Sequence, residues 1–200
     1  LLDVPDMDAA VRRIREAEPT LLAAVNALHP TIQRLGGGAR SLSTHILPQT
    51  TVGPMLIVHI HYDVRDAMGA NAVNSAAELL APRLEALSGG RANLRILTNL
   101  TDERLAWARC RVPAASLTRP GMDGRLLARR IVEANAFALA DPYRAATHNK
   151  GIMNGVDAVA MATGNDWRAL EAGAHAYAAR DGRYRGLTQW RLTEDGDLEG

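Results

Sequence analysis

Lys150 is the residue whose type and surroundings most favour a chemical role. It is the only lysine of the chain, and the other 22 basic residues are arginines. A general surface role for lysine is therefore not expected, and a desolvated, chemically used ammonium group is one interpretation. Asp166 follows at a predicted helix start, where the helix dipole favours an anion. The two side chains could pair, and the alternative is an ordinary ion pair and a helix cap.

A second candidate site lies on a predicted strand over residues 56–64. Its apolar positions alternate with His59, His61 and Asp63, which therefore project from one face. Imidazole and carboxylate groups together imitate a metal site. The solvated side of a strand gives the same pattern, and the sequence contains no further ligand cluster. We therefore expect no metal.

Two glycine-containing segments are candidates for anion binding. Residues 65–71 connect the strand to a predicted helix, where backbone N–H groups and the helix dipole converge. The alternative is a tight turn in which Gly69 permits close packing. The run of glycines at 36–38 could cradle a phosphate, but it lacks the lysine of a P-loop and the spacing of a dinucleotide fingerprint. A flexible turn is the simpler interpretation of that run.

The elements that must position these residues are predicted from caps and periodicity and indicate an α+β fold. A domain boundary is expected between about residues 98 and 113. The first half should begin with a helix that Asp6 caps and Pro19 ends, followed by a helix that Thr20 caps and His29-Pro30 closes and by a turn at 32–35. The strand at 56–64 should precede a helix with Leu79 to Leu87, which Pro82 interrupts and Ser88-Gly89-Gly90 ends, and then strands at 93–99 and 105–112. The second half should contain a helix from about Gly124 to Asp141-Pro142 and close-packed helices in the Ala- and Gly-rich stretch 145–180.

Length, composition and charge limit the class of protein. With 200 residues, 47% of them hydrophobic, the chain is long enough for one or two folded domains. The net charge of +1 provides no strong electrostatic field that would attract nucleic acid or an anionic membrane. No apolar run approaches the roughly 20 residues that span a bilayer.

The cysteine content and the start of the chain bear on its location. Cys110 is the only cysteine and no leader pattern opens the chain, so we expect a soluble protein of the reducing cytoplasm. Because the chain starts at Leu1 and not at Met, we expect a piece of a longer protein.

Three motifs in order resemble one enzyme family. They are DVRDAMGAN at 63–71, THNKGIMN at 147–154 and ATGNDWR at 162–168. Together they closely resemble the class II, bacterial form of 3-hydroxy-3-methylglutaryl-CoA (HMG-CoA) reductase. The resemblance covers nearly all of the chain, including 36–38 and 171–177. It implies an oxidoreductase that interconverts HMG-CoA and mevalonate plus CoA with two hydride transfers to or from NAD(H) or NADP(H).

The resemblance also implies roles for individual residues. Lys150 matches the catalytic lysine, whose cation would stabilise the oxyanion formed during thioester and aldehyde reduction. Asp166 matches the catalytic aspartate, which holds the lysine and couples to a protonated glutamate. Arg144 matches an arginine that grips the substrate carboxylate. Asn99 and Asn154 match polar contacts around the substrate and the lysine.

The same resemblance implies the domain organisation. Residues 1–98 are expected to form a small, non-Rossmann, ferredoxin-like NAD(P)-binding domain, and 99–200 part of a helix-rich, HMG-CoA-binding domain. The cofactor loop would include Asp66, Met68, Gly69 and Asn71. A homodimer or a multiple of dimers is expected, because members build their active sites across the subunit interface.

The chain departs from the family pattern in two respects. The family's catalytic glutamate and C-terminal catalytic histidine have no match, and neither His148 nor His175 lies at the position of that histidine. We therefore expect no turnover from this chain alone. His29 also stands where NADH-using members carry an aspartate that contacts the adenosine ribose. The choice between NADH and NADPH is accordingly open.

Two other functions are kept as alternatives. In the first, Lys150 forms a Schiff base with a carbonyl substrate or a pyridoxal cofactor. In the second, the chain is a noncatalytic module that binds a nucleotide or CoA, which the missing glutamate and histidine would allow.

Overall fold

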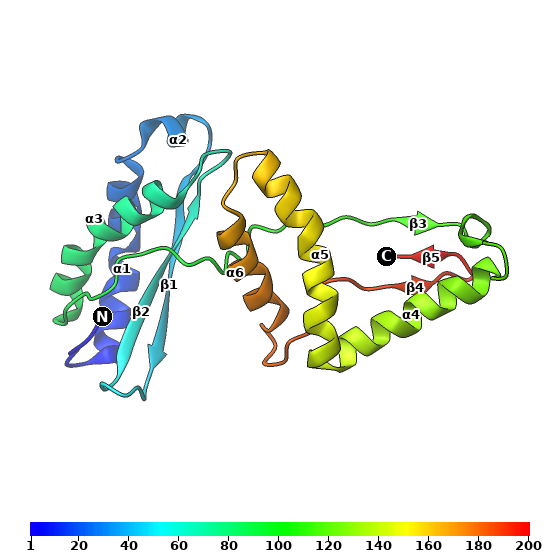
Figure 1. Ribbon diagram of the computed structural model, residues 1–200. Coiled ribbons are helices and arrows are strands. Elements are labelled where there is room, and N and C mark those ends of the chain that lie inside the picture. Colours follow the sequence, from blue (N-terminus) through cyan, green and yellow to red (C-terminus); the bar gives the residue numbers. More distant parts are fainter. The chain divides into compact units, whose positions relative to one another are not determined.

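The computed structural model describes residues 1–200 and divides the chain into two compact units, Leu1–Leu97 and Thr98–Gly200. Helices and strands occur in both units, so the predicted α+β class is confirmed (Figure 1). The dinucleotide and substrate roles expected for the two parts remain predictions. No helix is long and apolar enough to cross a membrane.

The first unit places two long helices against a two-stranded antiparallel hairpin. Its elements are α1 (Met7–Asn26), α2 (Pro30–Arg34), β1 (Gly38–Leu47), β2 (Met55–Asp63) and α3 (Ala70–Ser88). Strand β2 confirms the predicted alternation, because Leu56 is fully buried and Val58, Ile60 and Tyr62 pack on the core. Strand β1 was not predicted. The pairing of β1 with β2 shifts register between Ala39 and Ser41.

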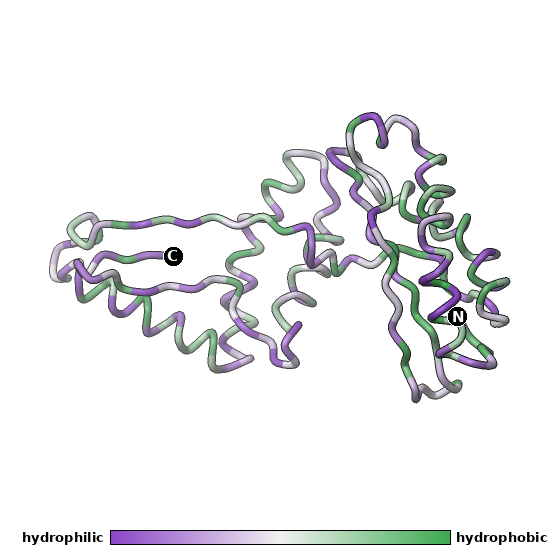
Figure 2. The backbone as a smooth tube through the Cα atoms, turned by 180° about the vertical axis from the view of Figure 1, so that it is seen from behind, coloured by the Kyte–Doolittle hydropathy of each residue, from purple (hydrophilic) through white to green (hydrophobic).

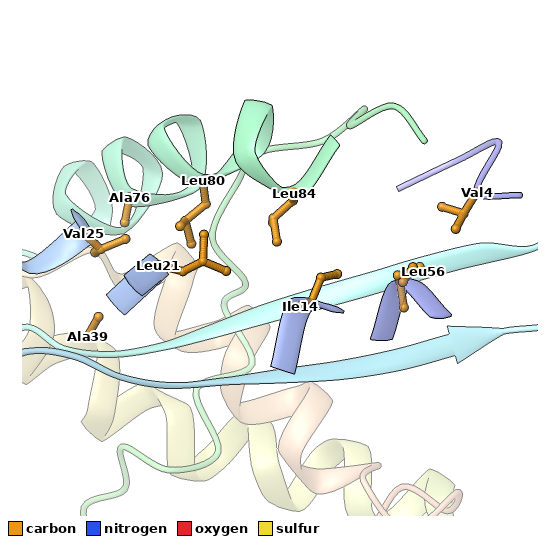
Figure 3. Close-up of a cluster of buried hydrophobic side chains, with 10 residues drawn as sticks. Val4, Ile14, Leu21, Val25, Ala39, Leu56, Ala76, Leu80 and Leu84 are labelled. Carbon is orange, nitrogen blue, oxygen red and sulfur yellow. The ribbon is translucent and has the colours of Figure 1, made fainter. Parts of the chain in front are cut away.

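The core of the first unit lies between the helices and the hairpin (Figure 3). Ile14, Leu21 and Val25 share the inner face of α1, while Leu80 and Leu84 point from α3 toward the strands. Asp6 caps α1 as predicted, because its carboxylate accepts from the Ala9 N–H at 2.9 Å. Gly89, in the left-handed conformation at φ 74°, ends α3 as predicted.

Two prolines predicted to break helices lie inside continuous ones. Pro19 lies within α1, so Thr20 is not a new cap, and Pro82 lies within α3. An interior proline costs about 3 kcal/mol. Burial of Leu21 and Val25 on the far side of Pro19 contributes roughly 1.5–3 kcal/mol for each side chain and offsets that cost.

The predicted strands at 93–99 and 105–112 were wrong except at β3 (Arg111–Val112). Leu94 and Ile96 are 82% and 66% exposed, and Trp107 is 85% exposed. Period-2 alternation alone does not make a strand, because a strand needs a paired neighbour for its backbone groups. Residues 93–99 and 105–109 have no such neighbour, whereas Cys110, next to β3, exchanges two backbone hydrogen bonds with Gly200.

The second unit consists of three helices and a small sheet. Its elements are β3, the 3-10 helix η1 (Ala114–Leu117), α4 (Gly124–Ala140), α5 (Pro142–Ala162), α6 (Trp167–Ala178), β4 (Arg191–Leu192) and β5 (Leu198–Glu199), with strand order β3-β5-β4. In Figure 2 the tube through α4 alternates between green and purple, as expected for a helix with one apolar side. The helices approach closely through buried small residues, among them Ala128, Ala138 and Ala145. Close packing was predicted for the stretch 145–180 and is found there only in part, because Ala145, Ala160 and Ala178 are buried whereas Gly151 and Gly155 face open space.

Candidate active site

Lys150 lies in the middle of α5 and is exposed. The helix starts where the sequence provides both a cap and a first-turn proline. The Asp141 carboxylate accepts from the Arg144 N–H at 2.7 Å, and Pro142 occupies the first helical position. Ala145, Asn149 and Met153 recur every fourth residue and form the buried face. Lys150 is therefore held on a helix whose rotation about its axis is fixed by burial.

Two buried asparagines anchor α4 and α5 to the segment 185–190. The amide of Asn149, 0% exposed, donates to the Arg185 carbonyl at 2.9 Å and accepts from the Leu187 N–H at 2.8 Å. Asn135, 3% exposed, donates to the Thr188 carbonyl and accepts from the Trp190 N–H, both at 2.9 Å. Each side chain thus pairs with the extended segment as a neighbouring strand would.

Sequence reasoning missed both asparagines, although one signal was present. The four-residue spacing of Ala145, Asn149 and Met153 places an amide on an otherwise apolar helix face. A buried amide in that position requires hydrogen-bond partners.

Asp166 is the N-cap of α6, which confirms the predicted helix start. Its Oδ1 accepts from the N–H groups of Arg168 and Ala169 at 3.1 and 3.2 Å. The Arg168 guanidinium lies 3.5 Å from the same oxygen. The backbone hydrogen bond from Ala169 contributes most to lowering the pKa of Asp166 below its usual value, and Arg168 adds to it. Of the two interpretations that the sequence left open, the helix cap is thus formed, and no ion pair between Asp166 and Lys150 is present.

Arg144 lies in the first turn of α5 near His148. The His148 ring Nε2 is 2.7 Å from the Thr188 hydroxyl. Burial, followed by the charge of Arg144, lowers the pKa of His148 below its usual value. A neutral imidazole therefore contacts segment 185–190, while Arg144 supplies a cation at the start of the helix that carries Lys150.

Asn154 and Asn99 also belong to the second unit. Asn154 is exposed and lies four residues after Lys150, on the same side of α5. Asn99 lies in the extended segment before β3, and its carbonyl faces α6 at Gly173, where a Cβ atom would come within 2.5 Å of it. Gly173 therefore permits the close approach of this segment to α6.

The predicted cofactor residues lie in the first unit. Asp66, Met68 and Asn71 are exposed around the start of α3, and no side chain caps that helix. Gly69 is needed for packing, because a Cβ atom there would lie 2.5 Å from a methyl group of Val64. The tight-turn interpretation of Gly69 is thus supported, and the uncapped N–H groups remain available to an anion.

His29 precedes α2 and makes no side-chain cap. Its ring meets Tyr62 edge to face, with centroids 6.4 Å apart. The His29 Nε2 atom and the Tyr62 hydroxyl are both buried without a hydrogen-bond partner. Burial raises the pKa of Tyr62. Two unpaired polar atoms, one on His29 and one on Tyr62, therefore lie at the position predicted to contact the adenosine ribose.

The glycine run at 36–38 forms a turn and does not cradle a phosphate. The N–H groups of Gly36 and Gly37 donate to the Gln33 and Ile32 carbonyls, both at 2.9 Å. The Gly36 carbonyl accepts from Arg40 and Arg65. Because its donors are committed and its carbonyl faces cations, this turn presents the wrong polarity to an anion.

The histidine face of β2 is engaged in local contacts. His61 Nε2 lies 2.9 Å from the Ser43 hydroxyl, and Asp63 pairs with Arg40 at 2.9 Å. No three His, Cys, Asp or Glu side chains of the chain are grouped as a metal ion would need.

A shallow, mainly apolar depression lies where α5 approaches α6, and the predicted catalytic side chains do not line it. Its lining residues are Gly155, Val156, Val159, Ala160, Thr163, Asn165 and Leu170.

Comparison with known proteins identifies one family. The family described as Hydroxymethylglutaryl-coenzyme A reductase matches residues 1–200. A 3-hydroxy-3-methylglutaryl-coenzyme A reductase of Archaeoglobus fulgidus is 44% identical over 193 residues, which are 96% of this chain and 43% of the relative. A probable reductase of the same name from Borreliella burgdorferi is 35% identical over 178 residues, covering 88% of this chain and 41% of the relative.

Solved structures of reductases with the same name also match the whole chain. A 3-hydroxy-3-methylglutaryl-coenzyme A reductase from Streptococcus pneumoniae matches with a TM-score of 0.95 at 47% identity and covers 100% of this chain and 47% of that chain. The class II reductase of the same organism bound to NADPH in open conformations matches with a TM-score of 0.94 at 47% identity, covering 100% and 48%. The chain thus spans less than half the length of each of these relatives.

Proposed function

Because this chain belongs to the hydroxymethylglutaryl-coenzyme A reductase family, we propose that the protein containing it interconverts HMG-CoA and mevalonate plus CoA with two hydride transfers. The observation that carries this proposal is the family match over residues 1–200, a range that includes all three motifs. The chain covers less than half of its relatives, so the proposed activity is that of the whole protein.

Lys150 is proposed as the group that stabilises the oxyanion. Reduction of a thioester, and then of an aldehyde, places negative charge on the former carbonyl oxygen. A fixed cation at that oxygen lowers the barrier to both reductions. The exposure of Lys150 supports this role, because its ammonium is accessible and has no ion-pair partner. The buried face of α5 also fixes the direction in which Lys150 points.

Arg144 and Asp166 are proposed to complete this part of the site. The Arg144 guanidinium would hold the substrate carboxylate through two parallel hydrogen bonds. Asp166 is ionised near neutral pH and would orient the Lys150 ammonium once the substrate is bound. Asn154, on the Lys150 side of α5, and Asn99 would supply polar contacts around the acyl group.

A nicotinamide dinucleotide is proposed as cofactor, and it would donate or accept the hydride. NADPH is bound in the related class II structure from Streptococcus pneumoniae. The uncapped start of α3 fits a pyrophosphate, since its free N–H groups attract an anion. Asp66, Met68, Gly69 and Asn71 would form this contact, and His29 would face the adenosine ribose.

The remaining parts of the proposal concern the assembly. We propose that residues 1–98 form the ferredoxin-like NAD(P)-binding domain and 99–200 part of the HMG-CoA-binding domain. The catalytic glutamate and histidine would come from outside this chain, which alone would be inactive. Exposed apolar side chains on α5, including Val159 at 65% and Met161 at 61%, support burial against another subunit in a homodimer or a multiple of dimers. The single, free Cys110 suits a cytoplasmic location.

The test is turnover by the full-length protein. Lys150→Ala should lower the HMG-CoA-dependent oxidation of NADPH or NADH at least about 100-fold. Arg129→Ala, which removes only an exposed ion pair on α4, is the matched control and should keep the parental rate. Retention of more than about a tenth of that rate by Lys150→Ala would overturn the assignment, because tenfold corresponds to only about 1.4 kcal/mol.

The two alternatives give different results. A Schiff-base enzyme would leave a borohydride-stable adduct on Lys150, detectable by mass spectrometry. A noncatalytic module would bind CoA or a nucleotide in calorimetry without any turnover by the full-length protein. The family match favours neither alternative.

A further inference from the structure

A chain of titratable side chains links α5, α6 and the segment that follows α6. The His175 ring lies between two partners, with Nε2 2.7 Å from Glu171 Oε2 and Nδ1 2.7 Å from the Tyr184 hydroxyl. The rings of His175 and Tyr184 are stacked, with centroids 5.9 Å apart and an interplanar angle of 27°. With Nε2 carrying the proton, His175 donates to Glu171 and accepts from Tyr184.

Asp157 of α5 extends this chain to a second carboxyl group. Its Oδ1 is buried and accepts no hydrogen bond from an N–H or hydroxyl group of the protein. The Glu171 carboxyl lies within hydrogen-bonding reach of Asp157. Two ionised carboxylates can only accept, so this contact is favourable only when one of them carries a proton. Burial first, and then Glu171, raise the pKa of Asp157 above its usual value. A proton held between the Asp157 and Glu171 carboxyls would therefore make this contact favourable.

The network lies beside the proposed catalytic residues on both helices. Asp157 is seven residues after Lys150, so both lie on one side of α5, about 10 Å apart along its axis, with Asn154 between them. On α6, Glu171 lies five residues, or about one and a half turns, after the N-cap Asp166. The contact between Asp157 and Glu171 thus joins the side of α5 that carries Lys150 to the helix that begins at Asp166.

We propose that Asp157, Glu171 and His175 are positioning residues that share a proton, hold α6 against α5 and thereby set Asp166 relative to Lys150. The part that concerns turnover rests on the proposed reductase function. The groups that face the shared proton are Asp157 from α5, Glu171 and His175 from α6, and Tyr184 from the following segment. None of the four is proposed to touch the substrate.

The pH dependence follows from the proton that the two carboxyls share. Asp157 has a raised pKa in the folded protein, so its contribution to the contact is complete below the usual aspartate pKa and is lost as pH rises through the raised pKa. Above that pH both carboxylates are charged and repel each other. The Glu171 and His175 side chains are 30% and 38% exposed, so solvent screens part of this repulsion. We expect a graded loss of alignment and not unfolding.

Asp157→Asn tests the proposal in the full-length protein. The new amide donates to Glu171 at every pH, so the fall in kcat that accompanies deprotonation should disappear. At the lowest pH the variant should match the parent, and above the transition it should exceed the parent about two- to fivefold. Glu171→Gln should flatten the profile in the same way. Asp157→Ala removes the titrating group and the donor together, so its profile should be flat but stay below that of Asp157→Asn at every pH. Glu133→Gln, at an exposed ion pair of α4, is the control and should follow the parental profile.

A second measurement does not depend on turnover. Amide hydrogen exchange of α6, corrected for the intrinsic effect of pH, should become faster in the parent as pH rises and stay constant in Asp157→Asn. In infrared difference spectra of the parent minus each conservative variant, the band of one protonated carboxylic acid should persist above the usual aspartate pKa. Parallel kcat profiles together with parallel exchange profiles would overturn the proposal. A parent without reductase activity would contradict the proposed function alone, because exchange and infrared data would still decide the network.

Discussion

Asn149 is completely buried while Lys150, the next residue on α5, is exposed. Adjacent helical residues point about 100° apart, so the burial of one amide fixes the direction of the neighbouring ammonium. The amide is held by the carbonyl of Arg185 and the N–H of Leu187 at 2.9 and 2.8 Å. The polar anchor of the helix and its proposed catalytic cation are therefore one structural unit.

Asn149→Leu should destabilise the protein and reduce turnover together. Leucine has a similar volume, but it leaves the partly buried Arg185 carbonyl and Leu187 N–H without their Asn149 partner, at a total cost of about 1–3 kcal/mol. Urea unfolding of the full-length protein should show the loss. Asn154→Ala on the exposed side of α5 is the control and should change the unfolding free energy by less than about 0.5 kcal/mol. Equal stabilities of the two variants would contradict the anchoring role.

Asp166→Asn separates helix capping from catalysis. Asparagine caps a helix about as well as aspartate, so stability at neutral pH should stay within about 0.5 kcal/mol of the parent, whereas Asp166→Ala should lose about 1 kcal/mol. Turnover should fall severely in both variants, because neither has the carboxylate proposed to orient Lys150. If Asp166→Asn retained parental turnover, Asp166 would be a helix cap only.

The same variant carries a pH signature. The pKa of Asp166 is lowered in the folded protein, chiefly by the Ala169 N–H. Its contribution to stability is therefore present above the usual aspartate pKa and is lost as pH falls through the lowered value. Unfolding at a series of acidic pH values should show a smaller acid-induced loss in Asp166→Asn than in the parent. An identical acid dependence would show that the carboxylate is not stabilised by its helix.

Local patterns predicted much of this fold because their physical causes are local. Asp6 and Asp166 cap the helices that follow them, and Gly89 ends α3 in the left-handed conformation that glycine tolerates. The pattern at 56–64 identified a strand because one side packs on a core. The helix ends predicted at Pro19 and Pro82 were wrong. Both prolines are tolerated inside α1 and α3 because these helices pack on the core, and the residues next to a proline in the sequence do not reveal that packing.

The candidate site was predicted by motif and not by geometry. Lys150 and Asp166 were both selected as candidates, and their catalytic roles stay predictions. Each has a local environment that spacing alone did not reveal. The anchoring amide of Asn149 and the contact between Asp157 and Glu171 join residues from different elements. Such contacts depend on how helices pack, so a single sequence gives only weak signals for them.

Arg144→Lys should separate substrate binding from cofactor binding. Lysine keeps the positive charge but lacks the planar fork that holds a carboxylate through two hydrogen bonds. Calorimetry with the full-length protein should show weaker binding of HMG-CoA and unchanged binding of the nicotinamide cofactor. His148 is the internal check, since its pKa is lowered partly by the charge of Arg144, which lysine preserves. Equal losses for both ligands would identify Arg144 as a structural residue.

His29→Asp should change the choice of cofactor. NADPH carries a 2′-phosphate on the adenosine ribose, and an aspartate facing that group would repel it, whereas an imidazole does not. The parent should therefore discriminate only weakly between NADH and NADPH. His29→Asp should lower kcat/KM for NADPH at least about tenfold relative to NADH, which corresponds to about 1.4 kcal/mol of added repulsion.

The control for this prediction lies on the same ring contact. Tyr62→Phe removes the buried hydroxyl beside His29 without adding charge, so it should leave the ratio of the two kcat/KM values unchanged. The measurement is that ratio for the parent and both variants in the full-length protein at one ionic strength, because salt screens the repulsion. A strong preference for NADH in the parent that His29→Asp does not alter would show that residue 29 does not face the ribose. The start of α3 would then be the only part of the first unit still proposed to contact the dinucleotide.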